Sequence, residues 1–372
     1  MATSNSSLSL PRVPCTICSG TFTARGLKCH MTRKHPSRQP TSQIPDNTNI
    51  FGILSRLKIN RKTLKRIPKG AKISAAEALS TTITNCLNSE NTDNWMNLFL
   101  FSFKSFPIPD KTTNGPSLTS KVKSNIDLDW NNFSWNENTN NHQIKNSDPK
   151  TSYAKRAISK LEDGDISGAV RILSSDESFA PFDSSTLESL RLKHPTASSQ
   201  SFSPVPLSNL TTSPFQTCEE DVLKAIFSFP SGSAGGIDGL RPQYLKDMVG
   251  SQTGAAGCKL VKSLTELANT MLRGAILLAL CPVLYGANLC ALRKKDGGIR
   301  PIAIGNTFRR LVSKLCNTML IPKTTSFLLP FQYGVGIKGG AESVVYSLRA
   351  FINDNSDNNF SILKIDLKIR LI

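Results

Sequence analysis

The chain has 372 residues, enough for two or three compact units, and carries 45 Lys and Arg against 27 Asp and Glu, a net charge of +18. Its nine cysteines form no disulfide framework, and the Ser- and Asn-rich N-terminus lacks the apolar segment of a signal peptide. These features argue against a secreted, disulfide-stabilised protein. They predict a reducing compartment, cytosol or nucleus, with the nucleus favoured.

The positive charge is concentrated at one end of the chain. Residues 1–70 hold 13 Lys and Arg and a single acid, Asp46. Such a basic segment is typical of proteins that bind a polyanion, most often nucleic acid. A solubility tail or a membrane-surface patch is the alternative. We favour DNA and RNA as partners because a zinc-ligand pattern lies in the same stretch.

That pattern spans residues 13–36. It consists of Cys15 and Cys18, then His30 and His35, a donor set that suits tetrahedral zinc. The close cysteine pair fits a hairpin and the spaced histidines fit one helix face, so a small ββα zinc finger is predicted. Cys29 is an alternative third ligand.

The finger should recognise base sequence poorly. Counting back from His30 places Thr23, Gly26 and Cys29 at the base-reading positions, and a single finger covers about three base pairs. Four other side chains suit phosphate contacts: Arg25, Lys28, Arg33 and Lys34. Protein–protein contact is the alternative use of the module.

Composition and periodicity divide the chain into segments along its length. We predict disorder over 1–12, the finger over 13–36, a linker over 37–50, a basic and helical region over 51–108, a disordered linker over 109–150, a helical segment over 151–195, a linker over 196–216 and a mixed α and β domain over 217–372. The basic helical region supplies four further nucleic-acid contacts: Arg61, Lys62, Lys65 and Arg66.

Local signals refine two of these segments. In residues 151–193, Asp163-Gly164-Asp165 indicates a break between helices, and Ser184-Ser185-Thr186 is a candidate helix cap. From residue 217 on, the pattern predicts helix 219–228, glycine loop 231–239, helices 242–276, hairpin 284–305, helix 308–321, loop 329–340, helix 341–353 and strand 360–366. The uncharged run from Gly274 to Leu292 is broken by Pro282, so we predict no membrane span but the end of a buried helix, a turn at Cys281-Pro282 and a buried strand.

Asp296-Gly297-Gly298 between two apolar runs is a strong hairpin signal. This turn should hold Lys294 or Lys295 beside Arg300. A guanidinium fork next to an ammonium point charge suits a triphosphate. A solvated basic turn is the alternative for the hairpin taken alone.

Motifs in fixed order across about 150 residues resemble the reverse transcriptases of non-LTR retrotransposons. They are Pro230–Lys246 with Gly235-Gly236-Ile237-Asp238-Gly239, Gly286–Leu289, Arg300–Asn306 with Arg309-Arg310-Leu311, Gln332–Gly336 and Leu363–Lys368. Residues 161–195 also look like these elements. A finger ahead of the polymerase is similar to the site-specific branch of the group. The resemblance implies a multidomain chain: zinc finger, helical middle, and an incomplete α+β reverse-transcriptase domain of fingers and first palm strand over 217–372.

The resemblance also implies roles for individual residues. Lys294, Lys295 and Arg300 would contact the phosphates of the incoming nucleotide, and Asp366 would be catalytic and hold magnesium, with the backbone carbonyl of Leu367 assisting. A two-metal phosphoryl transfer needs further carboxylates, and no Tyr-x-Asp-Asp motif is present. The match breaks at Ile369. We therefore predict a truncated RNA-directed DNA polymerase that binds nucleic acid without polymerising. The alternatives are a non-enzymatic zinc-finger nucleic-acid binder derived from a mobile element and, for Asp366 itself, a simple strand-end residue.

Overall fold

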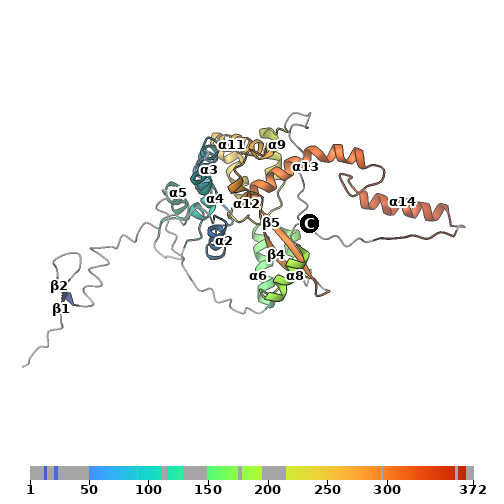
Figure 1. Cartoon of the computed structure of the whole chain (residues 1–372), viewed down its shortest axis with the longest axis horizontal. Helices are drawn as coiled ribbons and strands as arrows, with labels where there is room; N and C mark the ends of the chain where they lie inside the picture. Colours follow the sequence, from blue (N-terminus) through green and yellow to red (C-terminus); the bar gives the residue numbers. More distant parts are fainter. Residues whose placement is uncertain are drawn as a thin grey trace, which may run out of the picture. The chain divides into compact units, whose positions relative to one another are not determined.

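The structure is a computed structural model. It describes residues 12–14, 21–23, 50–89, 91–109, 115–128, 149–174, 178–194, 215–294, 296–356 and 359–365. The chain divides into two units, Met1–Asn49 and Ile50–Ile372. Over the described residues it is mostly helical, with thirteen α-helices, one three-stranded antiparallel sheet and one two-stranded hairpin (Figure 1).

In the first unit, the described residues form two short strands. β1 (Arg12–Pro14) pairs antiparallel with β2 (Thr21–Thr23), and Val13 lies opposite Phe22. The two cysteines of the predicted zinc motif, Cys15 and Cys18, fall between these strands in the sequence and lie outside the described residues.

The second unit contains all the other elements. Its helices are α2 (Ile50–Asn60), α3 (Lys72–Leu87), α4 (Thr92–Ser105), α5 (Leu118–Asp127), α6 (Pro149–Glu162), α7 (Ile166–Ser174), α8 (Ser184–Lys193), α9 (Glu219–Phe227), α10 (Pro242–Met248), α11 (Gly254–Leu272), α12 (Cys281–Tyr285), α13 (Thr307–Leu328) and α14 (Gly340–Asp354), with short 3-10 turns η2 (Lys69–Ala71), η5 (Ser251–Thr253) and η6 (Leu278–Leu280). Its strands are β3 (Ser178–Phe179), β4 (Ala287–Arg293) and β5 (Ile299–Gly305).

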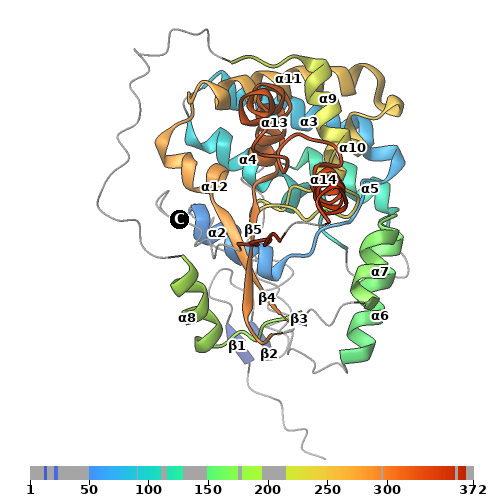
Figure 2. The same cartoon turned by 90° about the vertical axis from the view of Figure 1, so that its right-hand side faces the viewer.

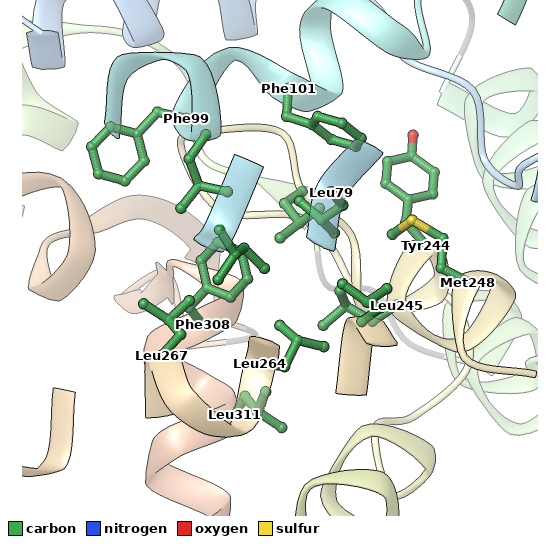
Figure 3. Packing of buried hydrophobic residues seen from close by; sticks show 14 of the residues in the cluster. Leu79, Phe99, Phe101, Tyr244, Leu245, Met248, Leu264, Leu267, Phe308 and Leu311 are labelled. Carbon is green, nitrogen blue, oxygen red and sulfur yellow. The ribbon is translucent and has the colours of Figure 1, made fainter. Parts of the chain in front are cut away.

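The hydrophobic core lies where α3 packs against α11, with α4, α9, α10 and the start of α13 around them (Figure 2). Apolar residues recur on one face of α3 at Ala75, Leu79 and Ile83, and all three are buried. Figure 3 shows Leu79 among leucines of α11 and α13 and the aromatic rings of α4 and α10. Phe106 after α4 packs on Tyr244 of α10, with ring centroids 4.8 Å apart.

Helix boundaries follow local chemistry. Asn91 caps α4 by accepting from the Asp93 N–H at 2.8 Å, and Asn306 caps α13 by accepting from the Phe308 N–H at 2.8 Å. Asp183, one residue before the cap predicted from the sequence, accepts from the Thr186 N–H at 2.7 Å and caps α8. Gly164, with φ of 75°, stands between α6 and α7, where the break was predicted.

The sheet has the order β3–β4–β5, and both pairings are antiparallel. β4 and β5 form the predicted hairpin, with Ala287 opposite Gly305 at one end and Arg293 opposite Ile299 at the other. Both strands are only partly buried, so the expectation of a fully buried strand after Gly286 was wrong. The predicted turn at Cys281-Pro282 is instead the short helix α12.

Three further segments differ from the sequence expectations. In the basic and helical region expected over 51–108, the first helix ends at Asn60, before most of the basic residues. The segment 109–150, expected to be a disordered linker, contains α5, whose Val122 and Ile126 are buried. The expected strand 360–366 has no strand pairing over its described residues 360–365, since a β-rich segment becomes a strand only beside a partner. Among helices in the described part, none is long and apolar enough to cross a membrane.

Candidate nucleic-acid interface

Many predicted site residues lie outside the described residues: Cys15, Cys18, Arg25, Lys28, His30, Arg33, Lys34, His35, Lys295, Asp366 and Leu367. Their geometry stays a prediction. In the part of the chain that is described, no three His, Cys, Asp or Glu side chains gather as a metal site. The site can therefore be built from Arg61, Lys62, Lys65 and Arg66, from Lys294 and Arg300, and from their surroundings.

The basic segment that follows α2 has no helix over residues 61–66, bends at Lys65 and Arg66, and is tied to the rest of the unit by backbone hydrogen bonds. The Leu64 N–H donates to the Phe106 carbonyl at 2.9 Å, and the Ile108 N–H donates to the Lys62 carbonyl at 3.0 Å. The Ile67 N–H donates to Asp247 Oδ2 at 3.1 Å. Backbone bonds of this kind hold the cations of residues 61–66 at defined positions without using their side chains.

The four predicted contact residues in this stretch differ in availability. Lys62 and Arg66 are exposed, and Arg61 is half-buried, with burial lowering the pKa of its guanidinium. Lys65 is directed to α6, where Nζ lies 2.6 Å from Glu162 Oε2 and donates to Ser159 Oγ at 2.9 Å. A phosphate contact by Lys65 would compete with Glu162. Lys62 and Arg66 are therefore the strongest candidates of the four.

The glycine loop, residues 230–240, is the most constrained segment near the basic stretch. A Cβ on Gly236 would lie 2.7 Å from the Asn306 Cα, and a Cβ on Gly235 would lie 2.8 Å from the Gly239 carbonyl oxygen. Gly239 has φ of 70°. Only glycine permits this close approach and this left-handed backbone.

Lys58 of α2 reaches into this loop. Its Nζ donates to the carbonyls of Gly235 at 3.0 Å and Gly236 at 2.5 Å. Burial lowers the pKa of Lys58, and the nearby Asp238 carboxylate opposes that shift. Lys58 therefore fixes the loop instead of facing solvent, a role that the sequence analysis missed.

Asp238 lies beneath the glycine loop and is 1% exposed. It accepts from the Asn306 side-chain amide at 3.0 Å and from the Leu240 N–H at 3.2 Å. Burial raises its pKa to about 6, although these hydrogen bonds and the Lys58 charge act in the opposite direction. Asn306 thus joins the glycine loop, the end of β5 and the start of α13. The sequence contained a signal for this role of Asn306, since a short polar residue directly before a helix, here α13 from Thr307, is typical of a helix N-cap.

The β4–β5 hairpin carries the second group of predicted contacts. Its turn is closed by the Gly297 N–H, which donates to the Lys294 carbonyl at 3.1 Å, and by the Lys294 N–H, which donates to the Gly298 carbonyl at 2.8 Å. Gly297 has φ of 77°, whereas Gly298 is not left-handed. Of the two glycines of the turn, Gly297 alone uses the left-handed backbone that favours glycine.

Arg300 lies opposite Leu292 in the hairpin register. Lys294 follows Leu292 by two residues, so strand alternation places Lys294 and Arg300 on the same face. Both side chains are exposed. This register places an ammonium and a guanidinium on one face near the turn, and phosphate binding by Lys294 and Arg300 stays a prediction.

The base of the hairpin lies beside α2 and the glycine loop. A Cβ on Gly286, just before β4, would come within 3.9 Å of the Phe51 ring, and Cys290 of β4 acts on the charge of Lys58. Arg309, after Asn306, donates to the Tyr285 carbonyl at 2.5 Å. One end of the hairpin thus packs beside Asp238 and Asn306, while the turn at its other end projects away from these residues (Figure 2).

Comparisons with known proteins assign no family. No family model, no curated protein and no solved structure matches the chain.

Proposed function

We propose that the chain binds nucleic acid and that residues 217–372 are related to the fingers and first palm strand of a retrotransposon RNA-directed DNA polymerase. The observation that carries the proposal is the Asp238–Asn306 hydrogen bond. It joins two segments that the family resemblance singled out separately, Pro230–Lys246 and Arg300–Asn306. Because these segments are distant in sequence, the packing of the first against the end of the basic hairpin that contains the second supports their origin in one functional unit.

The proposed roles follow the chemistry of each group. Lys294 and Arg300, with Lys295, contact phosphates of the nucleotide or template, since a guanidinium and an ammonium on one face match phosphate oxygens. Lys62 and Arg66 contact the backbone of the nucleic acid. The finger holds zinc through Cys15, Cys18, His30 and His35, because two thiolates and two imidazoles fit that metal.

Magnesium chemistry is a different matter. Magnesium would stabilise the attacking and leaving oxygens of a phosphoryl transfer, and such a site is built from several carboxylates. Asp366 and the Leu367 carbonyl are an incomplete donor set, and the sequence contains no Tyr-x-Asp-Asp motif. We therefore derive no catalytic step and expect binding without primer extension. A non-enzymatic binder derived from a mobile element remains the second candidate, favoured by this incomplete set.

The proposal is tested by measuring the affinity of the full chain for single-stranded RNA across a series of salt concentrations. Phosphate contacts give a steep loss of affinity with salt, and each contact to a single strand contributes about 0.7 to the log–log slope. The double variant Lys294→Gln/Arg300→Gln should reduce the slope by about 1.4.

The matched control is Lys259→Gln/Lys262→Gln, which removes the same charge from two exposed positions on α11. It should leave the slope near that of the unmodified chain. A flat salt response of the unmodified chain would rule out the binding function. Template-directed extension that is lost in Asp366→Ala would instead overturn the expectation of binding alone.

A further inference from the structure

Three cations contact Phe229, two residues after the end of α9, and a fourth lies near one of them. The Lys246 Nζ donates to the Phe229 carbonyl at 2.6 Å. The Lys314 Nζ and the Arg310 Cζ lie 5.0 Å and 5.6 Å from the centre of the Phe229 ring. Arg66 belongs to the basic stretch after α2. The N–H of the next residue, Ile67, donates to Asp247, the neighbour of Lys246, at 3.1 Å, and the charge of Arg66 helps to lower the pKa of Lys246. Three chain segments distant in sequence thus bring positive charge to one place.

The charges in this cluster repel one another. The pKa of Lys246 is lowered, first by burial and then by Lys314 and Arg66. Within the described part of the chain, the four salt bridges involve Lys65, Lys72, Lys160 and Lys224, and none involves a member of the cluster. The carboxylate of Asp238 acts on Arg310, which is held at the glycine loop. An anion bound here would relieve repulsion that the protein itself leaves in place.

A purely structural role explains only part of this arrangement. Lys246 and Lys314 lie against carbonyls just after α9, at 2.6 Å from the Phe229 oxygen and 3.5 Å from the Ser228 oxygen, as cations near a helix C-terminus often do. One cation would suffice for that purpose, and an ammonium has three N–H donors. Capping also gives no reason for Arg66 to lie near Lys246.

Arg310 has a different role from the other three. Its Nη2 donates to the Ala234 carbonyl at 2.5 Å and to Thr307 Oγ1 at 3.1 Å, and burial lowers its pKa. It therefore contributes positive potential while its guanidinium remains bound to the glycine loop. Direct contact with a ligand falls to Arg66, Lys246 and Lys314.

We propose that Arg66, Lys246 and Lys314 form a second phosphate-binding site, separate from the hairpin, for the backbone of a bound nucleic acid. The proposal rests on the proposed function and adds a position on the helical unit where the strand passes. Arg66 is exposed and Lys246 and Lys314 are partly exposed. Such an open arrangement suits a strand lying across the surface better than a small ligand that must be enclosed.

The test compares salt-dependent binding of single-stranded RNA by the full chain and by Lys246→Gln/Lys314→Gln. Loss of two phosphate contacts should lower the slope by about 1.4, which corresponds to about 25-fold weaker binding at about 0.1 M salt. The charge-matched control is again Lys259→Gln/Lys262→Gln. Lys246→Arg/Lys314→Arg keeps the charge and should retain most of the affinity.

A second variant distinguishes a loss of binding from a loss of folding. Arg66→Gln/Lys314→Gln leaves the Lys246–Phe229 hydrogen bond intact and should give the same loss, while circular dichroism and the thermal midpoint check the fold. If the RNA affinity of the unmodified chain falls steeply with salt, but the Gln variants of the cluster bind as well as the control variant does, this site alone would be overturned. No salt-dependent binding by the unmodified chain would overturn the proposed function with it.

Competition with a free deoxynucleoside triphosphate separates the two sources of phosphate. If the site takes a strand backbone, the triphosphate displaces RNA no better from the unmodified chain than from the Gln variants. Selective displacement from the unmodified chain would show that the cluster binds a free nucleotide, and the proposal would be wrong.

Discussion

Helices α3 and α14 both carry apolar residues at helical spacing, but their surroundings are opposite. Six residues of α3 are buried against neighbouring helices, whereas α14 buries only Gly340. Val344, Tyr346 and Phe351 of α14 are all exposed, and Phe351 makes an edge contact with the Phe360 ring at 5.6 Å. An apolar stripe therefore predicts which face of a helix favours burial. It does not predict that a partner covers that face.

The same contrast runs along α13. Phe308, Leu311 and Leu315 are buried near its start, while Phe327 near its end is 86% exposed. The segment that begins in the core thus leaves it within one helix. The change from buried to exposed side chains therefore occurs within α13 itself. The packed region before it and the open region after it can be compared in one protein.

Amide hydrogen exchange should show the largest difference between the two regions. Amides of α3 are expected to exchange only on global unfolding, because the helix is buried in the core. α14 has little tertiary packing, and a 15-residue helix is marginal on its own. We expect exchange at least about a hundredfold faster in α14 under native conditions. Equal protection of the two helices by mass spectrometry would contradict this.

Side-chain truncation should give the next largest difference. Leu79 on α3 is fully buried, so Leu79→Ala should lower the free energy of unfolding by about 2–5 kcal/mol. Phe331, after α13, is 93% exposed, and Phe331→Ala should change it by less than about 0.5 kcal/mol. Urea denaturation measures both variants. A larger cost at Phe331 would mean that the open region is covered in solution.

The buried carboxylate in the packed region should make stability depend on pH. The pKa of Asp238 is raised to about 6 in the folded protein from 3.8, so the folded state holds the proton more tightly. The resulting stabilisation is complete below the unfolded value and is lost as pH rises through about 6. Between about pH 4 and about pH 7 the unmodified protein should lose about 2.4 kcal/mol relative to Asp238→Asn.

That comparison uses urea denaturation of both proteins at each pH. Asn at position 238 retains one oxygen acceptor but faces the Asn306 amide with a second amide, so Asp238→Asn should be less stable at low pH. The informative quantity is how the difference changes with pH. Curves that stay parallel would show that Asp238 does not titrate in this range.

Local signals predicted much of the fold and some of the candidate site. The Asp296–Gly298 turn located the hairpin, and the glycine at 164 located the break between α6 and α7, because these positions depend on neighbouring residues only. α5 was missed because Val122 and Ile126 are its only buried residues within a polar, Asn-rich region. The expected strand over 360–366 was an error of context, since pairing depends on residues elsewhere in the chain.

Local sequence signals could not predict the contacts that shape the site, because those contacts join residues far apart in the sequence. Lys58 looked like one of many cations of a basic helix, and nothing near it in sequence indicates a bond to Gly235. The cluster of Arg66, Lys246 and Lys314 likewise forms only when α10 and α13 come together. Zinc and magnesium ligation stays predicted, because Cys15, His30 and Asp366 lie outside the described residues.

The bond between Lys58 and Gly236 also has a consequence for how the protein is made. It spans 178 residues, and comparable spans separate Leu64 from Tyr244 and Ser80 from Ser263. At about 5–20 residues per second, a ribosome needs roughly 10 to 40 s to add that length. Helices α3 and α4 therefore emerge from the ribosome long before α10 and α11. Until those helices are made, the apolar faces of α3 and α4 have no partner to pack against. We expect folding to be slow and late, with chaperones retaining the early helices until α11 has left the ribosome.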